Sequence, residues 1–244
     1  EGLVGSEMCI RDRINLLVDT ILASFLGFGS ISYLYFADRI AQLPLGIIGI
    51  ALGTTLLSSL SKSDAIKDAN QFSKELIISF KIGLFFSIPA ALVFINFSDL
   101  LIKVLFERGE FTFKETTQTS YALLAYAVGV PAFIMVKSCQ PAFLAEGNTK
   151  TPMYIGFILL ILNIILSFSL MIFLKHAGIA LATSIVSWIG TIIYITLLIK
   201  TRKIEKPNFS SQKEGNLFSV IFYGVKIILI SILMILSMKF AQHI

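Results

Sequence analysis

A chain of 244 residues that is 56% hydrophobic and 14% charged, with a mean hydropathy of +0.85, has more apolar surface than a soluble domain of this size can bury. The composition therefore excludes a soluble fold and predicts a multi-span membrane protein. A net charge of +5 would suggest a nucleic-acid partner in a soluble protein, but here most lysines and arginines lie in short loops between apolar segments. That distribution indicates membrane topology and no nucleic-acid partner.

The first residues, 1–13 (EGLVGSEMCIRDR), differ from everything that follows. They have neither a helical apolar face nor the charged start, long apolar run and cleavage site of a signal peptide. We expect this segment to be unstructured or foreign to the native chain, with the transmembrane region occupying residues 14–244 and further sequence missing upstream.

Apolar runs divide residues 14–244 into about seven predicted spans. A helix needs about 20 apolar residues to cross the hydrocarbon core of a bilayer, and these runs are separated by polar or glycine-containing turns. The fold class is therefore all-α, a polytopic membrane helical bundle. The predicted spans are 14–28, 30–60, 75–97, 115–136, 152–174, 179–199 and 217–240.

Local signals refine three of these boundaries. Residues 98–108 alternate apolar and charged positions at helical spacing, which predicts a short interfacial helix ended by Gly109. Thr112 and Glu115 have capping-box spacing at the start of the fourth span. Thr151 with Pro152 predicts the N-cap and first turn of the fifth span, after a polar connection over residues 137–150.

The second span carries two adjacent charges, Asp38 and Arg39, in an apolar surround. A charge near the centre of a membrane helix costs from roughly 3 to more than 10 kcal/mol, and such charges usually face a bundle interior or a water-filled cavity. Pro44 then removes a backbone donor, so we interpret the segment as a kinked helix whose charged half faces a cavity. The alternative is that Asp38 and Arg39 sit at the helix end, where their side chains reach the lipid headgroups, or that the two opposite charges neutralise each other.

A second group of polar side chains is spread over three spans. Asp19 lies on the first span, Asn163 and Ser167 lie one turn apart on the fifth, and Thr183 lies on the sixth. Oxygen ligands on facing helices could hold a sodium ion, or Asp19 could carry a proton, which would couple transport to a gradient. The alternative is that Asn163, Ser167 and Thr183 only form hydrogen bonds between helices. We assign no metal site with certainty and expect no other cofactor.

Prolines inside spans are candidate hinges. Pro44, Pro89 and Pro131 each interrupt the hydrogen-bond ladder of an apolar segment. They are flex points for a transporter or, alternatively, static packing kinks. Lys81 and Lys226 lie about two turns inside their spans, from where their side chains can reach the headgroups.

The loop charges orient the bundle. Cytoplasmic loops of membrane proteins are enriched in lysine and arginine, and one end of this bundle carries the larger set. We therefore expect the chain to enter its first span from the cytoplasm and to finish its seventh outside. The cytoplasmic set is Lys62, Lys67, Lys74, Lys137, Lys150, Lys200, Arg202, Lys203, Lys206 and Lys213; the outer set is Lys103, Arg108, Lys114, Lys175 and Lys239.

Several ordered motifs resemble one family. The run SYLYFADRIAQLPLGIIGIALGTTLLSSLSK is followed by LFERGEF, AYAVGVPAF, VKSCQPAFLAEGNTKTP and LKHAG. Together these blocks resemble the MurJ (MviN) lipid II flippases of the multidrug/oligosaccharidyl-lipid/polysaccharide exporter superfamily. The resemblance covers residues 14–240.

The resemblance implies a fold and a function. MurJ proteins have 14 transmembrane helices in two lobes around a central cavity, so this chain would be a fragment that forms the second lobe and lacks helices 1–6 and 14. It implies a flippase that moves the undecaprenyl-diphosphate-linked peptidoglycan precursor from the inner to the outer leaflet of the bacterial inner membrane by alternating access. The expected partners are lipid II, membrane lipids and the missing N-terminal lobe.

The resemblance also assigns the charged pair. In the family the arginine of the ADR block lies in the cavity and meets the diphosphate, a role that passes here to Arg39, with Asp38 as its neighbour. A related exporter of another lipid-linked oligosaccharide or of drugs is the alternative function, and the ADR and QLP blocks argue against it. No clustered histidine, serine or carboxylate site suggests an enzyme.

Overall fold

A computed structural model describes residues 14–65, 69–201 and 217–242 of the chain. The described residues contain helices and turns and no strand, so the predicted all-α membrane bundle is confirmed. The segment 1–13 and the charges Lys67, Arg202, Lys203, Lys206 and Lys213 lie outside the described residues. The helices are Ile14–Ser24, α2 (Ser30–Pro44), the π-helical η1 (Leu45–Gly49), α3 (Ile50–Ala65), α4 (Ala69–Phe106), α5 (Phe113–Leu144), α6 (Lys150–Leu174), α7 (His176–Lys200) and α8 (Leu217–Gln242).

Six segments among the described residues are long and apolar enough to cross a membrane. The helix Ile14–Ser24 is apolar but shorter, and it begins at the first described residue. Elements α2, η1 and α3 together make one of the six. The segments are Ser30–Lys62, Gln71–Phe106, Phe113–Leu144, Lys150–Leu174, His176–Lys200 and Ser219–Lys239.

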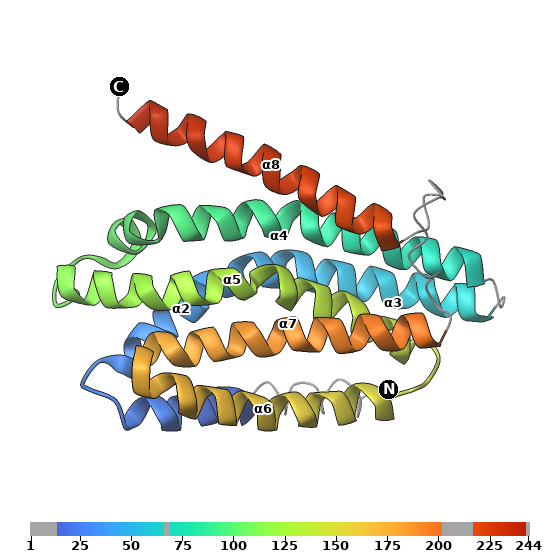
Figure 1. The fold of residues 1–244 in the computed structure, drawn as a ribbon, viewed down its shortest axis with the longest axis horizontal. Helices are drawn as coiled ribbons and strands as arrows, with labels where there is room; N and C mark the ends of the chain where they lie inside the picture. The colour runs from blue at the N-terminus through green and yellow to red at the C-terminus, as the bar shows by residue number, and fades with distance from the viewer. Residues whose placement is uncertain (1–13, 66–68, 202–216, 243–244) are drawn as a thin grey trace.

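Helix α5 is the centre of the bundle. It lies between α4 and α7, with α6 beyond α7 and α8 on the far side of α4 (Figure 1). Many of its side chains are buried, including Leu123, Ala127, Val130 and Ile134, because neighbours cover it on several sides. The elements around it therefore have one buried and one lipid-facing side, as expected for an amphipathic ring around a central apolar helix.

The contact between α5 and α7 depends on small residues. A Cβ atom placed on Gly129 would lie 2.9 Å from the Cα of Ser184, so the two backbones approach more closely than an alanine allows. At the same crossing, the Ser184 hydroxyl donates to the carbonyl of Ala125 at 2.7 Å. Two turns further along, the Thr191 hydroxyl lies 3.3 Å from the carbonyl of Ala132. Hydrogen bonds between α5 and α7 thus add to the close packing that holds the two helices together in lipid.

The break between α2 and α3 follows from Pro44. Proline has no amide hydrogen, and the turn that follows it is π-helical over Leu45–Gly49. The long segment therefore has two parts whose backbone bonds do not continue in register. The sequence prediction of a kink placed it where the helix type changes.

The connection between α5 and α6 differs from the sequence prediction at both of its ends. The connection expected over 137–150 is helical as far as Leu144, because Ser138, Cys139 and Gln140 are buried against neighbouring helices. Helix α6 begins at Lys150 rather than after Thr151, and the backbone amide of Thr151 donates to Oδ1 of Asn148 at 3.2 Å. An asparagine before the helix thus supplies the cap that we expected from Thr151.

The connection from α4 to α5 has the predicted form. Backbone angles leave the helical range at Phe97 (φ −126°, ψ 22°), so residues 98–106 form a separate short helical stretch after a kink. Gly109 has φ 61°, a left-handed conformation that favours glycine. The backbone amide of Thr112 donates to the Glu115 carboxylate at 2.9 Å, which completes that half of the predicted capping box.

Candidate functional site

Arg39 and Asp38 are neighbours in sequence, but their side chains have different partners. Successive residues of a helix project about 100° apart, so one can face the core while the next faces outward. The Asp38 carboxylate is half-buried, whereas Arg39 is exposed on the surface of the lobe. Asp38 and Arg39 attract each other electrostatically, but among the described residues they form no salt bridge within 4 Å.

Arg39 lies over an aromatic ring of its own helix. Its guanidinium carbon is 4.8 Å from the centroid of the Tyr35 ring, one turn earlier. A guanidinium over a ring face is attracted by the negative quadrupole of the ring, which holds the charge in place and leaves its N–H groups available at the edges. Arg39 therefore presents a fixed cation on a surface that this chain does not cover.

Asp38 is held by the next turn of α2. The side-chain amide of Gln42 donates to Oδ2 of Asp38 at 2.5 Å. This bond satisfies one carboxylate oxygen of Asp38 inside the bundle. Asp38 and Asp19 also lie close enough to repel each other.

The predicted polar group of Asp19, Asn163, Ser167 and Thr183 comes together where the helix Ile14–Ser24 packs on α6 and α7. The side-chain amide of Asn163 donates to Oδ1 of Asp19 at 3.3 Å. Thr183 on α7 lies near the same carboxylate, and its hydroxyl donates to the carbonyl of Ile179 at 3.2 Å. Ser167 is fully buried one turn along α6 from Asn163. Residues from three helices therefore meet around one acidic side chain.

Two oxygens of this group lack a hydrogen-bond partner. Oδ1 of Asn163 and Oγ of Ser167 are buried, and neither has a partner among the described residues. A buried polar atom without a partner costs about 1–3 kcal/mol, so such atoms in a membrane interior usually have an ion or water beside them. The donor set of carboxylate, amide and hydroxyl oxygens is the kind that hard cations prefer.

The three hinge candidates have different surroundings. Pro44 precedes the π-helical turn, whereas Pro89 and Pro131 lie inside uninterrupted helix. The non-helical backbone in α4 is at Phe97, two turns after Pro89. Among the three prolines, Pro44 is thus the one that is followed by a change from α-helix to π-helix.

Three further residues contribute to these sites although the sequence analysis did not single them out. They are Tyr35 beneath Arg39, Gln42 beside Asp38, and Asn15, whose Oδ1 accepts from the Asn163 amide at 3.0 Å. Each lies four residues from the site residue on its own helix. Residues at i and i+4 share a helix face, so this spacing could have identified all three.

Comparison with known proteins places this geometry in a family. The family described as "Lipid II flippase MurJ" matches residues 8–244 of the chain. The chain belongs to the MurJ family of lipid II flippases.

Relatives in the family are longer than this chain. The probable lipid II flippase MurJ of Vibrio cholerae is 38% identical over 178 residues, which cover 73% of this chain and 34% of the relative. Its counterpart in Rickettsia prowazekii is 39% identical over 193 residues, which cover 79% of this chain and 38% of that relative. The counterpart in Buchnera aphidicola subsp. Acyrthosiphon pisum is 33% identical over 232 residues, which cover 95% of this chain and 43% of that relative. The chain thus spans less than half the length of these MurJ relatives.

Solved structures agree with the fold. A structure described as lipid II flippase MurJ in an inward closed conformation matches with a TM-score of 0.79 and 32% identity, covering 95% of this chain and 45% of that one. A transporter of the MOP superfamily from Pyrococcus furiosus matches with a TM-score of 0.70 at 16% identity, which shows shared fold alone. Family membership and the apolar helices place this MurJ-family chain in the bacterial inner membrane as a multi-pass protein.

Proposed function

We propose that this chain is the second lobe of a lipid II flippase. It would act with a first lobe to move the undecaprenyl-diphosphate-linked peptidoglycan precursor from the inner to the outer leaflet. Its partners would be lipid II, the surrounding membrane lipids and that first lobe. No bond is broken in this passage, so the protein is a transporter and not an enzyme.

The observation that carries the proposal is the position of Arg39. It is exposed on a face of α2 that this chain leaves uncovered, and the Tyr35 ring holds it in place. A diphosphate needs compensating charge to pass through a low-dielectric region, and a guanidinium offers two parallel donors and stays charged when desolvated. Arg39 would bind the diphosphate. Asp38, turned toward Gln42, would shape the cavity wall beside it.

Coupling to an ion gradient is part of the proposal. Asp19, Asn163, Ser167 and Thr183 would hold a sodium ion, or Asp19 would carry a proton, with Asn15 as an additional oxygen. The unpartnered buried oxygens of Asn163 and Ser167 support a cation at this position. A charge bound between the helix Ile14–Ser24, α6 and α7 would bias how these helices pack, and that bias is what coupling requires.

Alternating access would use the break after Pro44. The lobe would rock against its partner while α2 and α3 change their relative tilt at the π-helical turn. The alternative, an exporter of another lipid-linked oligosaccharide or of drugs, has only the fold similarity at 16–18% identity in its favour. That similarity carries no information about substrate.

A chimaeric flippase tests the proposal. Residues 14–244 would replace the matching segment of the Vibrio cholerae relative, and the chimaera would be expressed in cells depleted of their own flippase. Growth, membrane level and lipid II exposure on the outer face would be measured. We expect growth with outer-face lipid II; a chimaera that reaches the membrane at normal level but exports a different lipid-linked sugar would support the alternative instead.

A further inference from the structure

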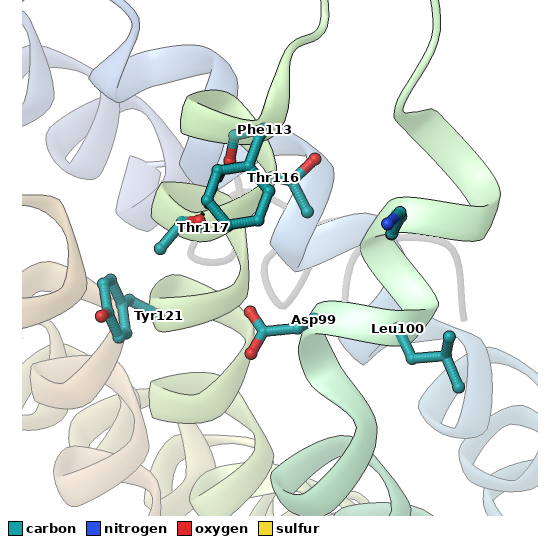
Figure 2. Close-up of a pocket in the computed structure, with 7 residues that line it drawn as sticks. Asp99, Leu100, Phe113, Thr116, Thr117 and Tyr121 are labelled. Carbon is teal, nitrogen blue, oxygen red and sulfur yellow. Dashed lines mark hydrogen bonds between the residues drawn. The ribbon is translucent and has the colours of Figure 1, made fainter. Parts of the chain in front are cut away.

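A pocket with a mainly apolar lining and two charged side chains lies between the end of α4 and the start of α5 (Figure 2), at the end of the bundle that the loop charges predict to be the outer one. Its cavity volume is about 360 Å³, which is at the lower end of the range of roughly 300–1,000 Å³ for small-molecule sites. We call it the outer pocket. It is lined by Asp99, Leu100, Lys103, Phe113, Thr116, Thr117 and Tyr121.

The outer pocket exists because α4 bends at Phe97. After that residue the short stretch 98–106 leaves the direction of the main helix, and the first turns of α5 face it. Figure 2 shows Asp99 pointing from this stretch toward α5, with Phe113 and Tyr121 on the α5 side. Two chain segments that meet at the turn around Gly109 thus form its two walls.

Its two charges remain available. The hydroxyl of Ser120, itself buried, donates to Oδ1 of Asp99, which orients the carboxylate and leaves the second oxygen toward the cavity. Lys103 lies one turn further along the same helical stretch and is exposed. Among the described residues, Lys103 has no salt bridge, although the spacing would permit one to Asp99. The pocket therefore presents a separated anion and cation.

The hydroxyls at the rim are already used. Thr116 donates to the Glu107 carboxylate at 2.8 Å, and Thr117 donates to the carbonyl of Phe113 at 3.0 Å. The open hydrogen-bonding capacity thus belongs mainly to the carboxylate and the ammonium. A ligand that matches the pocket must itself carry both a cation and an anion.

The position of the outer pocket relative to the membrane favours a lipid as its ligand. The α4–α5 connection lies at the end with fewer basic loop residues, which the positive-inside rule assigns to the outer face. Toward the membrane centre, the exposed Ile95 lies one turn below Asp99 and the exposed Val128 lies two turns below Tyr121. A molecule bound in the pocket could therefore continue into hydrocarbon along this apolar surface, as acyl chains do.

We propose that the outer pocket binds the headgroup of a zwitterionic phospholipid of the outer leaflet that carries a primary ammonium. The ammonium contacts the Asp99 carboxylate and the face of Tyr121, and the phosphate contacts Lys103. A primary ammonium donates hydrogen bonds that a trimethylated one lacks. The site thus distinguishes phosphatidylethanolamine from phosphatidylcholine.

Native mass spectrometry of the full chain in detergent tests this with three lipids of identical acyl chains. Phosphatidylethanolamine, phosphatidylcholine and phosphatidylglycerol would be added at equal concentration, and bound lipid would be counted. Exposed charge pairs are individually weak, so we expect a roughly twofold to fivefold excess of phosphatidylethanolamine over phosphatidylcholine. Equal binding of these two lipids by the unmodified chain overturns the proposal without any variant.

Variants assign the contacts. Asp99→Asn is expected to reduce phosphatidylethanolamine to the level of phosphatidylcholine without lowering phosphatidylglycerol, and Lys103→Gln to reduce all three. Glu110→Gln and Lys114→Gln, which change exposed charges at the same end but outside the pocket, are the matched controls. Circular dichroism and gel filtration check that each variant folds. An unchanged lipid ratio in folded Asp99→Asn, or the same loss in the controls, overturns the assignment.

Discussion

Arg39 and Asp19 are the residues on which substrate binding and ion coupling depend in the proposed mechanism. Each is positioned by a residue one turn away on its own helix or by a neighbouring helix: Tyr35 lies beneath Arg39, and Asn163 donates to Asp19. A charge that is held in place by its neighbours loses little further entropy on binding a ligand. Their roles can be separated by single substitutions.

Arg39→Ala in the chimaeric flippase should abolish growth while the membrane level stays near normal. A charge-assisted contact to phosphate is worth roughly 1.5–3 kcal/mol, so lipid II binding should weaken about tenfold to a hundredfold. Arg39→Lys should be impaired as well, since a point charge cannot hold two oxygens at once. Complementation, immunoblots of membranes and lipid II binding would be measured for both.

Lys226→Ala serves as the matched control for Arg39. Lys226 is an exposed cation inside α8, and we expect its loss to leave growth intact. Normal lipid II binding by Arg39→Ala would remove Arg39 from the site. Loss of the Arg39→Ala protein from the membrane would point to a structural role instead.

Asp19→Asn should remove ion coupling and preserve packing. The substitution keeps the shape and polarity of the side chain but deletes the charge that a sodium ion or proton requires. Growth of the chimaera would be followed across external sodium concentration and pH. Thr20→Val is the control, because the Thr20 hydroxyl bonds only to the Leu16 carbonyl of its own helix at 2.7 Å. Wild-type growth of Asp19→Asn under every condition would refute the coupling role.

At the scale of the elements, the lobe depends on the tight crossing of α5 and α7. Gly129 allows the backbones to meet there, and Ser184 adds a hydrogen bond across the crossing. Helices in lipid gain little from apolar burial against one another, so close packing and such bonds largely determine how strongly they associate.

Gly129→Ala should lower the stability of the lobe by about 1–3 kcal/mol, because its new Cβ would lie 2.9 Å from the Cα of Ser184, which cannot rotate away. Thermal unfolding in detergent measures the effect. Gly53→Ala is the control, since a Cβ on Gly53 has no neighbouring atom within 4 Å. Equal unfolding temperatures for the two variants would show that the crossing tolerates a wider separation.

Pro44→Ala should impair transport without destabilising the lobe. Alanine restores the missing amide and favours continuous helix by about 3 kcal/mol relative to proline, so the bend after α2 should become stiffer. Pro89→Ala is the control, because Pro89 lies in continuous helix. Growth of both chimaeras and their unfolding temperatures would be compared. Full growth with Pro44→Ala would show that Pro44 contributes to static packing and is not needed as a hinge.

At the scale of the whole molecule, Arg39 is exposed on a face of α2 that the described residues leave uncovered. One lobe offers one wall of a cavity, and alternating access needs two bodies that move against each other. We therefore expect residues 14–244, reconstituted alone in liposomes, to move lipid II no faster than empty liposomes do. A fluorescent headgroup-accessibility assay measures this, and translocation above the empty-liposome rate would contradict the two-lobe mechanism.

The sequence alone determined the fold class, the approximate position of the membrane helices and the family. Hydropathy, span length and proline position act over a few consecutive residues, so they can be interpreted without knowing which segments meet. The irregular turn after Pro44 and the capping of α5 by Glu115 were predictable for the same reason.

Only the tertiary structure decided which way side chains face and which helices share a site. Helix α5 continues to Leu144 because its polar residues are buried by neighbours, a fact that hydropathy along the chain cannot contain. Asn15 and Asp19 both accept hydrogen bonds from the Asn163 amide because the helix Ile14–Ser24 packs on α6. These pairings depend on contacts between segments more than 140 residues apart, such as Asn163 with Asp19 and with Asn15. Polar atoms inside a membrane must find their hydrogen-bond partners within the protein, and the packing of the helices decides which partners are available.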